Sequence, residues 1–100
     1  MELKLAQEFE YKGNDYWNWA VWGDAADAEL DAIETVEYTL HRSFPKPVRK
    51  ISARQTKFRL TTAGWGVFTI YAKAFLKNGK TVEMEHELSL AYPDGTLTMA

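Results

Sequence analysis

Hydrophobic and polar residues alternate along several short stretches of this chain, which is the pattern of half-buried β-strands. The stretches are residues 3–11, 16–22, 33–40, 48–52, 57–61, 67–76 and 81–90. Turn residues separate them, and Asn78-Gly79 is the strongest hairpin signal in the chain. Residues 23–31 are acidic and rich in alanine, which predicts either a long turn or one or two turns of helix.

This spacing of short strands predicts an all-β fold, an immunoglobulin-like β-sandwich of about seven or eight antiparallel strands. Within residues 16–22, Trp17, Trp19 and Val21 share one face because side chains alternate along a strand. The chain has 100 residues and no internal boundary, so we expect one domain over residues 1–100. A sandwich gathers its loops at two ends, where distant segments can form one site.

Composition narrows the class of protein only a little. The net charge is −2 and the chain contains no cysteine, which excludes disulfides and thiolate chemistry and fits the cytoplasm. The first residues lack the basic flank and apolar run of a signal peptide. No stretch approaches the ~20 apolar residues that span a bilayer. We therefore expect a cytoplasmic protein that does not associate with membranes.

Charge is unevenly distributed, because no acidic residue occurs between Glu37 and Glu83. The basic residues of this interval include Arg42, Lys46, Arg49, Lys50, Arg54, Lys57 and Arg59. They are open to two interpretations, a nucleic-acid-binding patch or outward positions that pair with acids on neighbouring strands. The second is favoured because the basic residues are spread over several strands without interleaved aromatic residues. A nucleic-acid partner is therefore not expected.

Candidate catalytic residues are few. Glu85-His86-Glu87 has the composition of a metal or acid–base cluster, but strand alternation places His86 on the face opposite both glutamates. We expect His86 to be a core or edge histidine with a local hydrogen bond. The chain shows no converging set of metal ligands and no nucleophile motif. These observations predict a protein that is not an enzyme and has no metal or cofactor.

Two segments at strand ends, residues 40–47 and 64–68, carry the most distinctive chemistry. Trp65 lies between two glycines, which allow a sharp turn and close approach of a ligand. Phe44 offers a second ring, and Ser43 offers a hydroxyl that His41 can orient. Two rings with a donor and an acceptor suit a planar amide, so these loops predict a narrow aromatic slot. The alternatives are that Trp65 is a buried loop anchor and Phe44 a plug of the core.

These segments resemble two loops of YEATS domains. Residues 41–47, HRSFPKP, are similar to their His-x-Ser-Phe-x-x-Pro loop, and residues 64–68, GWGVF, to their Gly-Trp-Gly-x-Phe loop. The strands around Trp19, around Tyr38 and over residues 83–90 also follow in order. The resemblance covers about residues 12–90 and is greater to the short prokaryotic versions than to those of chromatin.

The resemblance implies an immunoglobulin-type sandwich that binds acylated lysine. The residues implied to line the pocket are His41, Ser43, Phe44, Gly64, Trp65 and Gly66. The backbone N–H of Trp65 would bond the acyl carbonyl, Ser43 would face the amide, and Glu87 would contact a basic flanking residue of the ligand. Readers usually carry a further aromatic residue where this chain has Asp15, and Tyr16 or Trp17 is the candidate to replace it.

The sequence therefore predicts a non-catalytic module that binds an acylated lysine peptide, or another flat amide-bearing group, within a bacterial signalling or defence system. The alternative is an immunoglobulin-like protein–protein adaptor without a small-group pocket. Oligomeric state is not indicated by any feature of the sequence.

Overall fold

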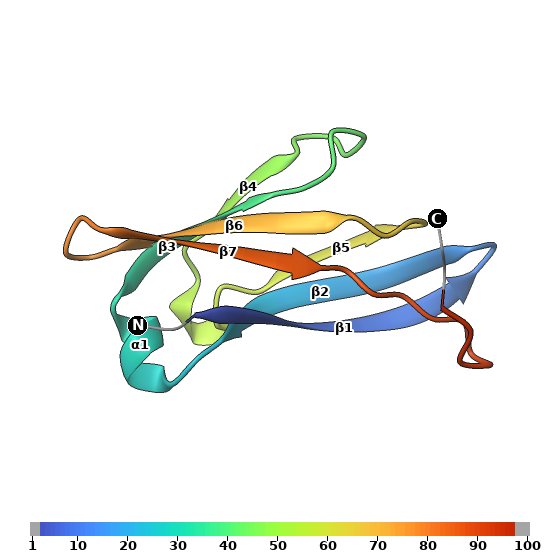
Figure 1. Cartoon of the computed structure of the whole chain (residues 1–100), viewed down its shortest axis with the longest axis horizontal. Coiled ribbons are helices and arrows are strands. Elements are labelled where there is room, and N and C mark those ends of the chain that lie inside the picture. The colour runs from blue at the N-terminus through green and yellow to red at the C-terminus, as the bar shows by residue number, and fades with distance from the viewer. Residues whose placement is uncertain (1–2, 98–100) are drawn as a thin grey trace.

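The computed structural model describes residues 3–97, so residues 1–2 and 98–100 of the predicted domain lie outside the described residues. The elements run in the order β1 (Lys4–Gly13), β2 (Tyr16–Asp24), α1 (Asp27–Asp31), β3 (Ile33–Thr39), β4 (Val48–Ile51), the 3-10 helix η1 (Arg54–Thr56), β5 (Leu60–Gly64), β6 (Thr69–Leu76) and β7 (Thr81–Glu87). Figure 1 shows α1 and the β6–β7 hairpin at one end of the molecule, and the β1–β2 turn and the end of β5 at the other.

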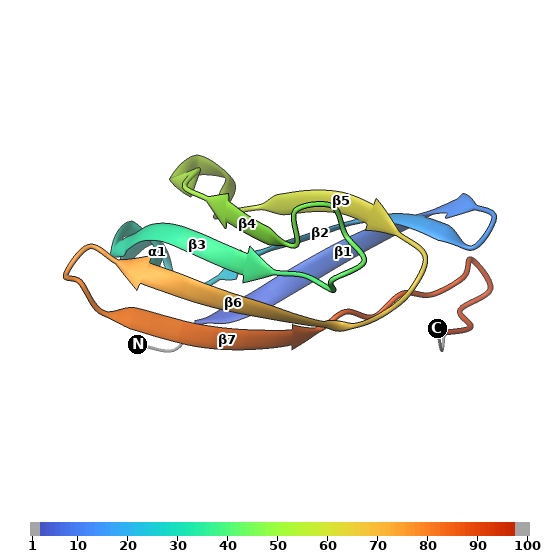
Figure 2. The ribbon, with the colours of Figure 1, turned by 90° about the horizontal axis from the view of Figure 1, so that it is seen from above.

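The strands form two antiparallel sheets, one of three strands in the order β1-β2-β5 and one of four in the order β4-β3-β6-β7. Figure 2 shows the four-stranded sheet with these strands side by side. The chain crosses from one sheet to the other between β2 and β3, between β4 and β5 and between β5 and β6, as in immunoglobulin-like sandwiches. The predicted all-β sandwich is confirmed.

The core lies between the two sheets. Trp17, Trp19 and Val21 face it from β2 and are at most 1% exposed, as the alternation along this strand predicts. Tyr38 of β3 and Ile70 of β6 are fully buried against them from the other sheet. These large inward side chains hold the sheets together through the burial of apolar surface.

The predicted strand at residues 57–61 is wrong. β5 begins at Leu60, because η1 precedes it and both Lys57 and Phe58 adopt left-handed backbone angles, with φ of 58° at each. A left-handed residue cannot continue a strand ladder. Phe58 is fully buried, and its carbonyl accepts a hydrogen bond of 2.7 Å from the Tyr38 hydroxyl. Tertiary contacts of this kind fix the backbone here, and the local pattern does not reveal them.

Two other strand ends differ from the pattern. β6 begins at Thr69, because residues 67–68 belong to the loop that follows Trp65. β7 ends at Glu87 although Leu88 and Leu90 remain buried, as the alternation predicts. Beyond Glu87 the backbone N–H of Ser89 donates to the side-chain oxygen of Gln7 and not to a backbone carbonyl of a strand. Residues 27–31 form one short helix, which decides between the two alternatives for the acidic segment.

The basic residues do not gather into a continuous patch. Lys50 lies 3.8 Å from Glu37, Arg54 pairs with Asp27 and Asp31, and Arg59 pairs with Glu8. This favours the interpretation that basic positions pair with acids on neighbouring elements. Among the described residues, no helix has the length and apolar character needed to span a membrane.

Candidate functional site

The structure brings the two predicted loops together at one end of the sandwich. Between the β3–β4 loop and the β5–β6 loop lies an open cavity of about 460 Å³, which we call the slot. Its lining residues are Tyr16, His41, Ser43, Phe44, Pro45, Ala63, Gly64, Trp65, Gly66, Val67 and Phe68. No carboxylate and no lysine or arginine occurs in this lining, so the slot suits an uncharged group.

The two aromatic residues that predict the slot, Trp65 and Phe44, differ in how far the protein buries their rings. Trp65 is 64% exposed, which excludes its interpretation as a buried loop anchor. Its ring contacts no other aromatic ring among residues 3–97. Phe44 is half-buried and packs against Phe68 and Trp19 at centroid distances of 5.4 and 6.2 Å. Phe44 is therefore a wall fixed to the core, whereas Trp65 has a ring that a ligand can cover.

A hydroxyl of defined orientation lies beside these rings. The Oγ atom of Ser43 is 2.8 Å from Nδ1 of His41, and the backbone N–H of Ser43 donates to the same nitrogen at 3.2 Å. In the tautomer that lets Nδ1 accept the backbone N–H, the hydroxyl of Ser43 also donates to this nitrogen. The lone pairs of Oγ are then left for a donor from a ligand, such as an amide N–H.

The β3–β4 loop that carries these groups is held by its own backbone and by Arg49. Leu40 N–H donates to the carbonyl of Pro47 at 2.7 Å, and Phe44 N–H to that of His41 at 3.0 Å. The guanidinium of Arg49 donates to the carbonyls of Pro45 and Lys46 at 2.9 and 2.8 Å. The loop is therefore organised before any ligand binds, which lowers the entropy cost of binding.

Gly64 leaves space at the inner end of the slot. A β-carbon at this position would lie 3.4 Å from Cζ of Phe44 and 3.7 Å from Nε1 of Trp19. That indole N–H is buried and has no hydrogen-bond partner among the described residues. Trp19 meets Phe44 and Phe68 edge-on, with interplanar angles of 82° and 66°. A glycine here therefore keeps the rings behind the slot within reach of a ligand.

Tyr16 supplies the additional aromatic wall. It is 43% exposed and lines the slot, whereas the side chain of Asp15 accepts a hydrogen bond of 2.6 Å from the hydroxyl of Tyr92. Trp17, the other candidate for this wall, is fully buried and donates to the carbonyl of Ala91 at 2.8 Å. Of the two candidates for this wall, Tyr16 therefore lines the slot and Trp17 does not.

Several lining residues were not among the predicted site residues. Phe68 was part of the resembling motif but was assigned no role, and its ring packs against Phe44 and His41 at 5.4 and 6.2 Å. Pro45, Ala63 and Val67 also line the slot. Their position beside Phe44, Gly64 and Gly66 is the only signal in the sequence that could have identified them.

Glu87 is not brought into the slot. It is exposed at the end of β7, opposite Thr69, while the next residue, Leu88, donates its backbone N–H to the carbonyl of Phe68 at 3.0 Å. Glu87 therefore lies near the β5–β6 loop but outside the cavity lining.

His86 has the local role expected from the sequence. Its Nε2 lies 2.6 Å from the side-chain oxygen of Gln7, and burial lowers the pKa of His86 below its ordinary value. Glu85 and Glu87 are exposed on the other face of the strand. Within residues 3–97, no group of three histidine, cysteine, aspartate or glutamate side chains could hold a metal ion.

The sequence of this chain is similar to those of known YEATS proteins. A family model of the prokaryotic YEATS domain matches residues 17–89. The protein AF-9 homolog of Saccharomyces cerevisiae is 39% identical over 61 residues, which cover 58% of this chain and 26% of that protein. The AF-9 homolog of Kluyveromyces lactis is also 39% identical over 61 residues, covering 58% of this chain and 27% of that protein. The chain spans about a quarter of the length of these relatives.

Solved structures give the same likeness. The Yaf9 YEATS domain that recognises an H3K122suc peptide matches with a TM-score of 0.67 and 26% identity, over 88% of this chain and 70% of that one. The Yaf9 YEATS domain bound to H3K27ac matches with a TM-score of 0.70 and 22% identity, over 98% and 82% of the two chains. The second match shows a shared fold.

Proposed function

Because the chain belongs to the prokaryotic YEATS domain family, we propose that it is a non-catalytic module that binds an acylated lysine side chain in the slot between Trp65 and Phe44. The observation that carries the proposal is the exposed, unstacked ring of Trp65 opposite a slot wall that holds the oriented hydroxyl of Ser43. The Yaf9 domain that recognises a succinylated histone H3 peptide, at 26% identity, supports an acyl-lysine ligand.

The proposed binding mode follows from the chemistry of the lining. The flat amide lies between the rings of Trp65 and Phe44, and its N–H donates to Oγ of Ser43. The backbone N–H of Trp65, the first residue after β5, donates to the acyl carbonyl. Tyr16 covers the open side, and Glu87 contacts a flanking side chain outside the slot. Both polar groups of the amide then have partners, which offsets their removal from water.

Acylation is proposed to act as the switch. It removes the positive charge of the lysine, and the slot lining has no carboxylate that could pair with an ammonium group. Burial of an unpaired ammonium costs several kcal/mol, even after partial compensation by the rings. A single acylated side chain should bind with a Kd roughly between micromolar and millimolar. A setting in a bacterial signalling or defence system stays a prediction from the family resemblance.

The test is calorimetric titration of the full chain with three peptides that differ only at one side chain: acetyl-lysine, unmodified lysine and trimethyl-lysine. We expect binding of the acetylated peptide alone. Trp65→Ala should weaken it at least about tenfold, since stacking and ring burial together contribute more than ~1.4 kcal/mol. Tyr71→Ala is the matched control, because Tyr71 is 52% exposed but does not line the slot.

Two results would refute the proposal. Preference for trimethyl-lysine would make the slot a cage for an organic cation. Equal loss of affinity in Trp65→Ala and Tyr71→Ala, or binding that neither change affects, would favour the adaptor alternative, in which a partner protein docks elsewhere on the sandwich.

A further inference from the structure

The rim of the slot carries two positive charges that form no ion pair with any carboxylate of residues 3–97. Arg42 lies between His41 and Ser43, and Lys46 directly follows Pro45, so both belong to the loop that forms one wall. Both side chains are exposed, and neither forms an ion pair among the described residues. They are therefore available to a molecule that occupies the slot.

The other basic residues between Glu37 and Glu83 fall into two groups, those that pair with carboxylates and those that form no ion pair within residues 3–97, which are Arg49, Lys57, Lys73, Lys77 and Lys80. Lys50, Arg54 and Arg59 each pair with a carboxylate. Arg49 binds the carbonyls of Pro45 and Lys46 with its guanidinium, so it adds a third positive charge next to the β3–β4 loop, and it forms no ion pair in the part of the chain that the structure describes. The β3–β4 loop beside the slot thus carries two basic side chains, Arg42 and Lys46, and no acidic one.

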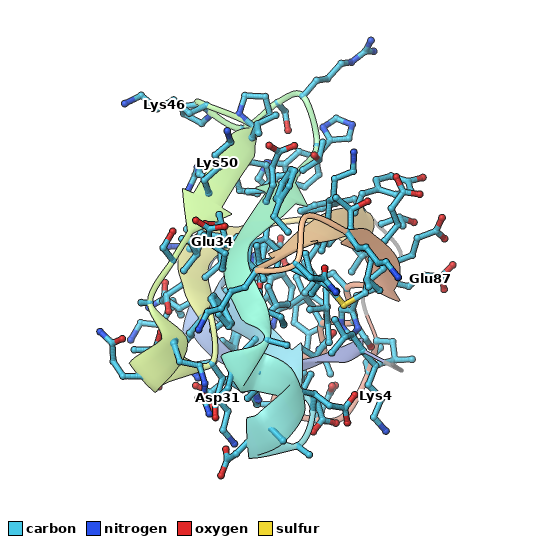
Figure 3. All side chains as sticks on the ribbon, turned by 90° about the vertical axis from the view of Figure 1, so that its left-hand side faces the viewer. Lys4, Asp31, Glu34, Lys46, Lys50 and Glu87 are labelled. Atoms are coloured by element: carbon cyan, nitrogen blue, oxygen red, sulfur yellow. The ribbon has the colours of Figure 1, made fainter. Side chains whose placement is uncertain are left out.

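The two edges of the four-stranded sheet have opposite charge. β4 forms one edge and β7 the other. Figure 3 shows Lys46 and Lys50 on one side of the molecule and Glu87 on the opposite side. Glu83, Glu85 and Glu87 are exposed along β7. A peptide held across the slot would therefore meet positive charge over the β3–β4 loop and negative charge beyond the β5–β6 loop.

We propose that the ligand is an acylated lysine followed or preceded by acidic residues, which lie over the β3–β4 loop against Arg42 and Lys46. This inference rests on the proposed function and names the class of peptide that the slot selects. Complementary charge at a rim favours the correct partner and speeds association, whereas like charge placed there is repelled. Because exposed ion pairs are weak individually, the acids select among acylated peptides but do not replace the acyl group as the determinant.

The experiment compares acetyl-lysine peptides of equal length whose neighbours, on either the amino or the carboxyl side, are three glutamates, three glutamines or three lysines. Titration with the full chain should show about three- to tenfold tighter binding of one glutamate peptide than of its glutamine counterpart. The lysine peptide with the same placement should bind more weakly than both. The preference should shrink as salt is raised, because exposed charges are screened.

Reversing the charge of Arg42 and Lys46 tests whether these two residues cause the preference for acidic peptides. The double variant Arg42→Glu with Lys46→Glu should reverse the order, so that the lysine peptide binds more tightly than the glutamate peptide. Lys77→Glu with Lys80→Glu is the matched control, because it changes the net charge equally on the β6–β7 hairpin, at the far end of the molecule (Figure 1). The control should keep the preference of the unchanged protein.

The outcomes separate this inference from the proposed function. Equal affinity for all acetylated peptides would overturn the charge selection and leave acyl-lysine binding in place. A preference that the control reverses as fully as the rim variant would also overturn it, since net charge alone would then be responsible. Absence of binding to every acetylated peptide would refute the proposed function. Salt-dependent binding of duplex DNA that the rim variant alone abolishes would assign Arg42 and Lys46 to phosphates, against the proposal.

Discussion

Two aromatic clusters near the same end of the sandwich differ in whether the protein covers them. Tyr11, Trp17 and Tyr92 contact one another at centroid distances of 5.0 to 5.4 Å, and their polar atoms bond Asp15 and Ala91. The chain after β7 supplies Tyr92 and the carbonyl of Ala91 to this cluster, in which Trp17 is fully buried. In the slot, Phe44 and Phe68 are partly buried, but Trp65 is 64% exposed and Tyr16 is 43% exposed.

The comparison teaches that aromatic composition alone does not mark a binding site. A cluster whose polar atoms are paired and whose rings are covered contributes to stability. A cluster that leaves a ring unstacked and a hydroxyl with free lone pairs is organised for a partner that is not part of the chain. In this sense the cluster of Tyr11, Trp17 and Tyr92 is closed, and the cluster that lines the slot is open.

Removal of a large ring should lower the free energy of unfolding much more in the closed cluster than in the open one. Trp17→Ala should cost about 3–5 kcal/mol of unfolding free energy, because Trp17 is fully buried and its loss leaves a cavity. Trp65→Ala should change the unfolding free energy by less than about 0.5 kcal/mol, as for other exposed positions. Urea denaturation followed by circular dichroism measures both. Similar losses in the two variants would show that Trp65 is part of the core.

Gly64→Ala should separate binding from stability within the open cluster. The new methyl group would occupy the space between Phe44 and Trp19 at ordinary contact distances, so the fold should tolerate it. We expect three- to tenfold weaker binding of an acetyl-lysine peptide, about 0.7–1.4 kcal/mol, with little change in melting temperature. Unchanged affinity would mean that the ligand does not reach this end of the slot.

Tyr92→Phe tests the closed cluster by removal of one hydrogen bond. The Tyr92 hydroxyl donates to the carboxylate of Asp15 at 2.6 Å. Its loss should cost about 1–2 kcal/mol of unfolding free energy, while affinity for the acetylated peptide stays within about twofold. Thermal denaturation and calorimetry provide the two readouts. A large loss of affinity with normal stability would place Tyr92 in the binding site.

The smallest expected effect concerns pH and lies outside both clusters. Burial lowers the pKa of His86, so the unfolded chain takes up a proton at higher pH than the folded protein. The stability of the protein should therefore be complete above about pH 6.5 and should fall as the pH drops toward the folded pKa. His86→Gln should make stability less dependent on pH in that window. An identical pH profile of melting temperature in both proteins would contradict this.

The fold was largely predictable because the period of two in hydrophobic positions reports burial directly. Trp17, Trp19 and Val21 are inward as that period requires, and Gly79 takes the positive φ of 89° that the Asn-Gly turn demands. β5 was misplaced because Lys57 and Phe58 adopt left-handed angles. Their N–H groups bond the carbonyls of Arg54 and Ala53 at the end of η1, and the Phe58 carbonyl accepts from the distant Tyr38. A local pattern contains no information on such contacts.

The slot could be predicted in part. Glycines on both sides of Trp65 and the neighbouring Ser43 and His41 indicated its two loops, and the structure places all of them around one cavity. The role of Phe68 and the choice of Tyr16 depend on how β2, β5 and β6 end relative to one another. Glu87 was placed by analogy, and its position outside the lining depends on where β7 ends.

The proposed binding mode depends most directly on where the acyl group lies in the bound protein. Intermolecular nuclear Overhauser effects between the methyl protons of an acetyl-lysine peptide and the ring protons of this protein would locate it. We predict contacts from that methyl group to the rings of both Trp65 and Phe44. Contacts to neither ring, with a bound peptide, would contradict the claim that these two side chains form the binding slot.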